Sequence, residues 1–120
     1  MRLVAIRGAI TVDKDDPQEI VDKTAFLLQK ILELNDVGSD DLVSIIFTAT
    51  EDLRSEFPAA GARAIGLLDV PLLGAREILV EHGPPRCIRV LVHCYSSKSR
   101  SEIKHVYEGE AKRLRVDLAN

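Results

Sequence analysis

The stretch "RCIRVLVHCY", residues 86–95, has the composition of a β-strand that is apolar on both faces. Because strand side chains alternate, two sets lie on opposite faces: Cys87, Arg89, Leu91, His93 and Tyr95 on one, and Ile88, Val90, Val92 and Cys94 on the other. Such a strand normally lies in the middle of a sheet and is covered on both sides. Arginine is almost never fully buried without a partner. The stretch therefore predicts a central strand with a guanidinium that requires an anion.

Length and composition favour an ordinary globular protein. The chain has 120 residues, which fits one domain over residues 1–120, with 46% hydrophobic residues, 29% charged residues and a formal net charge of -3. A slightly acidic chain without a basic run argues against nucleic acid or an anionic membrane as the partner. No apolar stretch approaches the roughly 20 residues of a membrane span, and Arg7 interrupts the short apolar run at the N-terminus. We therefore expect a cytoplasmic location.

The sequence lacks the patterns of a disulfide, a metal site, a phosphate-binding loop and a serine nucleophile. Cys87 and Cys94 lie seven residues apart on one predicted strand, a separation of roughly 23 Å that excludes a disulfide. His82, His93 and His105 lack the spacing of metal ligands. There is no glycine-rich phosphate loop and no G-x-S-x-G elbow. We therefore expect neither a metal nor a cofactor.

A long helix is predicted within "DDPQEIVDKTAFLLQKILELNDVG", residues 15–38. Asp16 fits the N-cap, Pro17 the first helical position, and Glu19 a capping-box-like arrangement. Gly38 is a stop signal. One apolar stripe at helical spacing predicts the buried face: Ile20, Thr24, Leu27, Leu28, Ile31 and Leu34.

The remaining elements are mainly strands, so the predicted fold class is α+β: a mixed β-sheet with one long and one short helix. The long helix must cover one face of this sheet. The short helix is predicted within residues 57–66, starting at Pro58 and ending at Gly66. Strands are predicted in four further segments: Arg2 to Val12, residues 40–50, residues 69–80 around Glu77, and residues 103–107.

Four arginines stand in apolar settings: Arg7, Arg63, Arg89 and, less clearly, Arg115. Holding a guanidinium in an interior costs several kcal/mol unless a partner compensates, and several together repel one another. A dianionic ligand is one natural partner, because guanidinium matches carboxylate geometry. The alternative is that each arginine pairs with an internal carboxylate such as Glu77, or reaches solvent.

Glu77 and Tyr107 each have two interpretations. Glu77 is either an edge residue or arginine counter-ion, or a group that accepts a hydrogen bond from a ligand hydroxyl. Tyr107 is either an aromatic at the edge of the core with its hydroxyl in water, or a phenol that reaches a carboxylate.

Six segments in this order and at these spacings resemble the monofunctional chorismate mutases of the bacterial AroH class: "IRGAITV", "TATEDLRSEFPAAGAR", "VPLLGAREI", "CIRVLVH", "HVY" and "LRVDL". The resemblance spans nearly the whole chain. It implies the rearrangement of chorismate to prephenate, a Claisen-type pericyclic reaction in phenylalanine and tyrosine biosynthesis. It also implies a homotrimer with a barrel-like core of sheets, helices outside, and active sites between subunits. No nucleophile, metal or cofactor is needed for this reaction.

The resemblance also implies roles for individual residues. Arg89 would lie beside the ether oxygen and the enolpyruvyl carboxylate as the main catalytic residue, and Glu77 would bind the ring hydroxyl. Arg7 would grip the enolpyruvyl carboxylate with help from Tyr107. The expected contributions to the pocket are an apolar wall from Phe57, a lining from Leu73, Gly74, Ala75 and Arg76, and an electrostatic rim from Arg63 and Arg115.

Two positions depart from the pattern of the resembling family. Ala60 stands where relatives often place a lysine, and Gly74 stands where a relative carries a cysteine. Both departures affect contacts with the substrate rather than the reaction.

A second hypothesis is a non-catalytic trimeric binding module for a small dicarboxylate metabolite. It explains Arg89 alone, but not Arg7, Glu77 and Tyr107 with it. In a third, structural interpretation, the arginines form ion pairs between subunits.

Overall fold

A five-stranded mixed sheet forms the centre of the molecule, with strand order β3-β2-β4-β1-β5. The structure, a computed structural model, describes residues 1–114. β4 runs antiparallel to β1 and β2, while β3 is parallel to β2 and β5 is parallel to β1. The strands are β1 (Arg2–Thr11), β2 (Leu42–Ala49), β3 (Leu72–Arg76), β4 (Cys87–Ser96) and β5 (Val106–Glu108).

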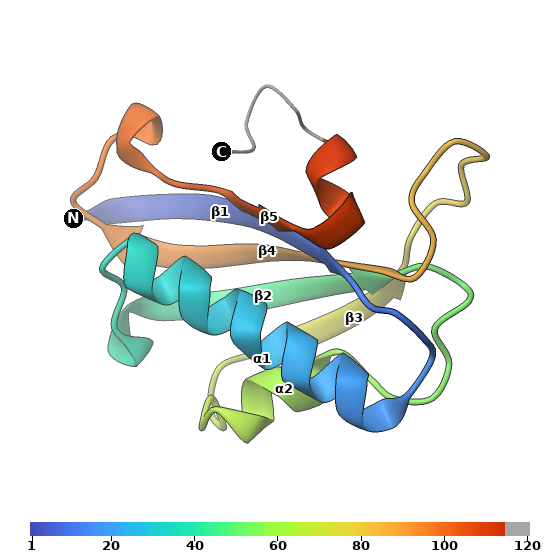
Figure 1. Cartoon of the computed structure of the whole chain (residues 1–120). Helices are drawn as coiled ribbons and strands as arrows, with labels where there is room; N and C mark the ends of the chain where they lie inside the picture. The colour runs from blue at the N-terminus through green and yellow to red at the C-terminus, as the bar shows by residue number, and fades with distance from the viewer. Residues whose placement is uncertain (115–120) are drawn as a thin grey trace.

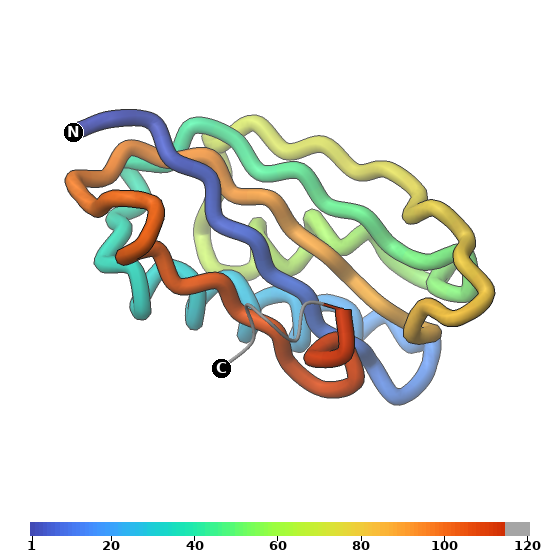
Figure 2. Tube along the Cα trace, turned by 90° about the horizontal axis from the view of Figure 1, so that it is seen from above, coloured from blue at the N-terminus to red at the C-terminus, as the bar shows by residue number. Residues whose placement is uncertain are grey.

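The helices are α1 (Pro17–Leu34) and α2 (Ala59–Ala64), with three short 3-10 turns, η1 (Ser39–Asp41), η2 (Arg100–Glu102) and η3 (Gly109–Arg113). Both α-helices lie on one side of the sheet, whereas η3 lies on the other (Figures 1 and 2). The α+β class with one long and one short helix is therefore confirmed. Among the described residues, no helix is long and apolar enough to cross a membrane.

β4 is the central strand, as predicted, but only one of its faces is covered. Side chains on the face toward α1 are buried, with Ile88 and Val92 both at 0% exposure. On the opposite face, Arg89 and His93 are half-buried and Tyr95 is 49% exposed. The expectation of cover on both sides was wrong for the isolated chain, because η3 packs over only one end of that face. We call this side of the sheet the open face.

α1 begins as its sequence predicts. The Asp16 carboxylate accepts a hydrogen bond from the Glu19 backbone N–H at 2.9 Å, and Pro17 is the first helical residue. The Glu19 carboxylate accepts from the Asp13 backbone N–H and not from Asp16, so the capping box reaches back to an earlier residue than expected.

The end of α1 differs from the prediction. The helix stops at Leu34, which is 39% exposed and does not belong to the buried stripe. Asn35 is buried and exchanges two hydrogen bonds with the Lys104 backbone, at 2.8 and 2.9 Å. Asp36, directly after the C-cap residue Asn35, has φ of 53° and so leaves the helical conformation. Gly38 is therefore not the stop signal; the buried amide of Asn35 ends the helix instead.

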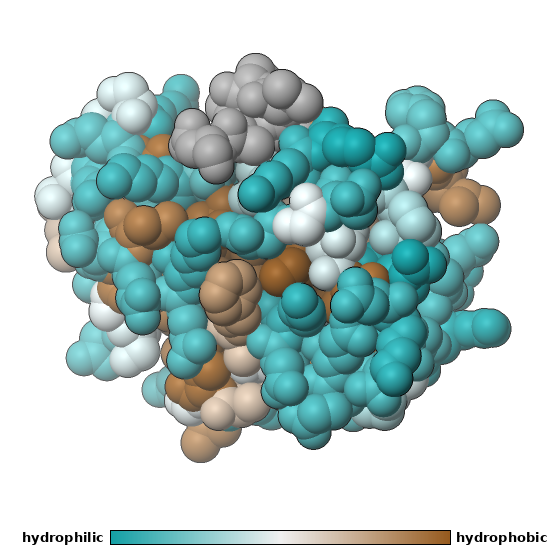
Figure 3. Space-filling model, viewed as in Figure 1, coloured by the Kyte–Doolittle hydropathy of each residue, from teal (hydrophilic) through white to brown (hydrophobic). Residues whose placement is uncertain are grey.

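Two glycines let α1 lie directly on its neighbours. A Cβ on Gly8 of β1 would lie 2.6 Å from Ile31 Cδ1, and one on Gly61 of α2 would lie 2.6 Å from Thr24 Cβ. α1 therefore packs in close contact with both the sheet and α2. Its outer surface is mainly hydrophilic, with scattered apolar patches (Figure 3).

Two predicted strands have different limits in the structure. β3 ends at Arg76, and Glu77 lies just beyond it, so the predicted strand around Glu77 was misplaced. The Glu77 N–H still donates to the Ala49 carbonyl at 2.9 Å, after which the chain leaves the sheet. β5 covers Val106–Glu108 instead of residues 103–107. The short helix is confirmed, with Pro58 at its N-cap and Gly66 at φ of 89° after its end.

Candidate active site

The strand register brings predicted site residues into one row across the open face. The row runs Tyr107, Ala9, Arg89, Thr48 and Ala75, from β5 to β3. Arg89 therefore lies at the centre of the sheet, with small or hydroxylated neighbours on both adjacent strands. This arrangement leaves space above the guanidinium.

Arg89 and Glu77 lie together, as predicted. Arg89 Nη1 donates to Glu77 Oε2 at 3.3 Å, and their side chains are 38% and 20% exposed. Thr48 Oγ1 donates to the same carboxylate oxygen at 2.8 Å. Glu77 is thus a counter-ion of Arg89 in the free protein, which was one of the two interpretations, and a single contact leaves most of the guanidinium donors unused.

A cavity of about 420 Å³ opens beside this pair. Its walls are Thr50–Asp52 at the end of β2, the loop of residues 78–85, Cys87 and Leu114. The lining combines apolar loop residues with Arg89 and four carboxylates, those of Glu51, Asp52, Glu77 and Glu81. Among the described lining residues, Arg89 is therefore the group that can bind an anion.

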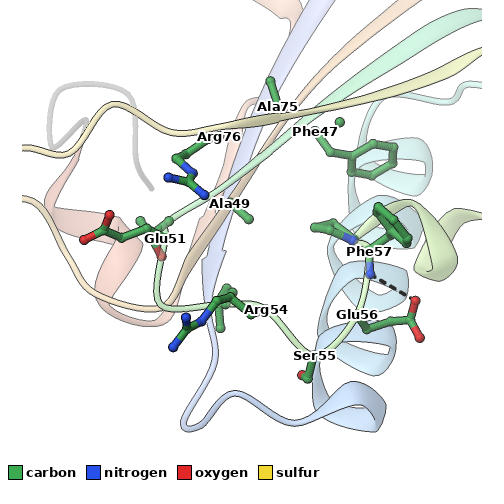
Figure 4. A pocket seen from close by; sticks show the side chains of 13 residues that line it. Phe47, Ala49, Glu51, Arg54, Ser55, Glu56, Phe57, Ala75 and Arg76 are labelled. Carbon is green, nitrogen blue, oxygen red and sulfur yellow. Dashed lines mark hydrogen bonds between the residues drawn. The ribbon is translucent and has the colours of Figure 1, made fainter.

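A second cavity, of about 570 Å³, contains Phe57, Gly74, Ala75 and Arg76 of the predicted set. In Figure 4, the Phe47 and Phe57 rings lie on one side of it, and the Arg54 and Arg76 side chains lie on the other. The Phe57 ring is 73% exposed, while its backbone N–H donates to the Glu56 carboxylate at 3.0 Å. This cavity shares Thr50 and Glu51 with the first.

Arg7 lies on the open face but one row away from Arg89, since it pairs with Leu91. It lines a third cavity, of about 580 Å³, together with Arg2, His93, Arg100 and His105. Its backbone N–H donates to His105 Nδ1 at 2.9 Å. No carboxylate within residues 1–114 forms an ion pair with the Arg7 side chain.

Tyr107 is buried, at 4% exposure, in a small cluster with Ala9, Cys87 and Ala111. Its hydroxyl is buried and has no hydrogen-bond partner among the described residues. The interpretation with the hydroxyl in water was therefore wrong. A buried phenol without a partner is costly, although Tyr107 lines none of the three cavities.

Three of the predicted residues that the structure describes line none of these cavities: Arg63, Leu73 and Tyr107. Arg63 is exposed on α2, not in an apolar setting, and Leu73 is 63% exposed on the face opposite Gly74. Strand alternation places Leu73 on the open face with Ala75 and separates it from Gly74 and Arg76. Arg115 lies outside the described residues.

Sequence reasoning missed the hydrogen bonds that fix the start of β4. Thr50 Oγ1 accepts from the Cys87 N–H at 2.9 Å and donates to Asp52, whose carboxylate also accepts from the Arg86 N–H at 3.0 Å. Arg86 has φ of 49°, an uncommon conformation for a side-chain-bearing residue. These bonds hold the strand that carries Arg89 against the end of β2. The only signal in the sequence is the run of hydroxylated and acidic residues after β2.

The pKa of the Cys87 thiol is shifted by its surroundings in the wall of the first cavity. Burial raises the pKa of its thiol to about 11, although the nearby Arg89 charge lowers that pKa in part. The thiol is thus a neutral, apolar part of the wall at physiological pH.

The chain was compared with protein families, curated proteins and solved structures, and all three comparisons found chorismate mutases. Residues 3–118 match the family model described as chorismate mutase type I. The chain belongs to that family, whose members are isomerases, so the predicted family and enzyme class are confirmed.

Two curated relatives and one solved structure agree with this assignment. The chain is 51% identical to chorismate mutase AroH of Thermus thermophilus, over 94% of this chain and 93% of the relative. It is 38% identical to chorismate mutase AroH of Bacillus subtilis, over 99% and 94% of the two chains. A chorismate mutase structure from Clostridium thermocellum superposes with a TM-score of 0.90 at 44% identity, covering 92% of this chain and 98% of that one. Nothing in these comparisons supports a non-catalytic binding module.

Proposed function

We propose that this family member rearranges chorismate to prephenate at the cavity that holds Arg89 and Glu77. In this reaction the ether C–O bond breaks while a C–C bond forms, and no proton is transferred. The observation that carries the proposal is a half-buried guanidinium that faces a cavity with a single carboxylate contact. The reaction requires a fixed cation and a shaped space, and the site offers both.

Arg89 is the main catalytic residue of the proposal. Negative charge grows on the ether oxygen as its bond to carbon breaks, so a preorganised cation there stabilises the transition state more than the ground state. A central strand held on both sides by neighbours fixes the position of Arg89 without reorganisation during the reaction. The spare N–H groups of the guanidinium would also bind the enolpyruvyl carboxylate.

Glu77 would bind the ring hydroxyl of chorismate. Glu77 lines the cavity, and its carboxylate lies 3.3 Å from the Arg89 guanidinium. A negative charge at this point favours the shift of charge from the ring toward the ether oxygen.

Arg7 and Tyr107 would complete the grip on the enolpyruvyl carboxylate. Within the described part of the chain, the Tyr107 hydroxyl has no hydrogen-bond partner and the Arg7 side chain has no ion pair, which supports an anion as the partner of both. Arg7 lies one row from Arg89, so its long side chain must extend toward the first cavity when the substrate binds.

We further propose a homotrimer with each active site between two subunits. The predicted site residues fall into separate cavities in one chain, with Phe57 and Gly74–Arg76 at the β3 edge and Glu77 with Arg89 beside the next loop. The open face also exposes apolar side chains that a second subunit would cover, including Leu3 at 55% and Leu73 at 63%. In the trimer, one subunit would supply Phe57 and Gly74–Arg76, and its neighbour would supply Glu77 and Arg89 to the same active site. Arg63 and Arg115 would lie on its rim.

The proposed function also includes a cellular location, a pathway and small-molecule partners. We place it in the cytoplasm as one domain over residues 1–120, acting on the route to phenylalanine and tyrosine. Two free, buried cysteines are compatible with a reducing compartment. Chorismate and prephenate are its proposed small-molecule partners, without nucleic acid or membrane.

The direct test is the conversion of chorismate to prephenate by the purified chain, followed by loss of chorismate absorbance and by chromatography of the product. We expect rapid turnover that is unaffected by a chelator. Binding of chorismate without any turnover, by a correctly folded chain, would contradict the enzyme and support a dicarboxylate-binding module.

A further inference from the structure

Thr48 makes the shortest hydrogen bond to the Glu77 carboxylate. Its Oγ1 lies 2.8 Å from Glu77 Oε2, whereas Arg89 Nη1 lies 3.3 Å from the same oxygen. The other carboxylate oxygen, Oε1, accepts from the Ile78 backbone N–H at 3.2 Å. Both oxygens therefore have a donor other than Arg89.

The backbone alone does not fix the Glu77 side chain. Glu77 follows the end of β3 and keeps one backbone bond to β2, from its N–H to the Ala49 carbonyl at 2.9 Å. Thr48 in contrast lies inside β2, paired with Arg89 on one side and Ala75 on the other. A β-branched side chain in a strand has restricted rotamers, so the Thr48 hydroxyl is a fixed donor beside Glu77, which lies outside the strand.

We propose that Thr48 is a positioning residue that keeps Glu77 from closing fully onto Arg89. A free carboxylate beside a guanidinium forms a bidentate pair, which would neutralise the cation and occupy two of its donors. The Thr48 hydroxyl holds Oε2 at 2.8 Å while the Ile78 N–H holds Oε1 at 3.2 Å, so the carboxylate cannot turn to present both oxygens to Arg89, which keeps one contact of 3.3 Å. Arg89 then retains donors for the ether oxygen, and Glu77 stays directed at the ring hydroxyl.

Thr48 acts through Glu77 and not on the substrate. It lines neither of the cavities that contain Glu77, Arg89 or Phe57. This inference rests on the proposed roles of Glu77 and Arg89, so its test needs a readout that separates a failure of Thr48 from a failure of those roles.

The test compares Thr48→Val, which removes only the hydroxyl, with Thr48→Ser, which keeps it. We expect Thr48→Val to lower kcat about tenfold, the effect of one well-placed hydrogen bond, with a smaller change in KM. Thr48→Ser should recover most of that loss. Thr24→Val is the matched control, because Thr24 is buried on α1 with no described partner for its hydroxyl, far from Glu77 in the fold.

A double-mutant cycle distinguishes positioning from a general effect on the fold. In a Glu77→Gln background, Thr48→Val should cause little further loss, because Thr48 then has no carboxylate to hold. Unchanged kcat in Thr48→Val, or the same tenfold loss with and without the Glu77 carboxylate, would overturn the inference. If Thr48→Val does not fold, Thr48→Ala takes its place in the cycle. A parent chain without turnover would instead refute the proposed function itself.

Discussion

At the residue scale, Arg89 shows how a strand can hold a charged side chain at moderate cost. It is only partly desolvated, with 38% of its side chain exposed, and it has a carboxylate within 3.3 Å. A fully buried pair would lose more to desolvation than its attraction returns. The guanidinium therefore remains charged, fixed and accessible, which are the three properties that the proposed reaction demands.

Cys87 gives a pH-dependent prediction at the same scale. Its pKa is raised to about 11 by burial, so the thiol is almost wholly protonated near neutral pH. We expect iodoacetamide to modify Cys87 roughly a hundred-fold more slowly than free cysteine at pH 8, because only the thiolate reacts.

The modification rate should then rise with pH through the window between the ordinary thiol pKa and about 11. Mass spectrometry of a Cys94→Ala variant isolates the signal of Cys87. Fast labelling at pH 7 in the folded variant would show that the thiol is not held neutral.

At the element scale, the contact between α1 and α2 depends on a missing side chain. A Cβ on Gly61 would lie 2.6 Å from Thr24 Cβ and 3.0 Å from the Ala25 backbone nitrogen. Since backbone cannot yield as a flexible side chain does, we expect Gly61→Ala to destabilise the fold by about 1–3 kcal/mol.

Gly38→Ala is the matched control for Gly61→Ala. Gly38 has φ of -85°, and no atom lies within 4 Å of an added Cβ, so its substitution should be neutral or slightly stabilising. Denaturant unfolding of both variants measures the difference. Equal stabilities would mean that the two helices do not pack as closely as described.

Local signals explain which elements could be predicted from the sequence. Asp16 and Pro17 fix the start of α1 through their own backbone and side chains, and alternation identified the strands. The end of β3 could not be predicted, because "AREILV" keeps the composition of a strand past Arg76. Only the length of the partner strand β2, which ends at Ala49, decides where the ladder stops.

Some features of the candidate site could likewise be predicted from local sequence, and others could not. Arg89 and Glu77 were expected together, and they are together. The bonds from Thr48 and Thr50 were missed, because they depend on the register between strands that are far apart in the sequence. Arg7 and Arg89 were both expected to bind the enolpyruvyl carboxylate, and this stays a prediction: Arg7 lies one row along β1 from Ala9, the partner of Arg89, and lines a different cavity.

At the scale of the whole molecule, η3 covers one end of the open face, and no other element within residues 1–114 covers the rest. It carries Tyr95, which is 49% exposed, while the opposite side of the molecule carries Phe26 on α1, also 49% exposed. If the open face is the trimer interface, a charge at Tyr95 should disrupt assembly, whereas a charge at Phe26 should not.

We therefore expect Tyr95→Glu to reduce the assembly from three copies of the 13.3 kDa chain to one, and Phe26→Glu to remain a trimer. Sedimentation velocity measures both. A trimer that survives Tyr95→Glu and dissociates with Phe26→Glu would place the interface on the helical side instead.

The proposed mechanism depends on the Arg89 cation at the breaking C–O bond. Steady-state kinetics of Arg89→Ala tests this role most directly. The parent, Arg89→Ala and Arg89→Lys are compared for prephenate formation, with circular dichroism and sedimentation to establish that each variant is folded and assembled. If Arg89 has this role, Arg89→Ala lowers kcat by about a hundred- to a thousand-fold or more. Arg89→Lys should recover part of the lost kcat. A folded, assembled Arg89→Ala with kcat close to that of the parent would contradict the account.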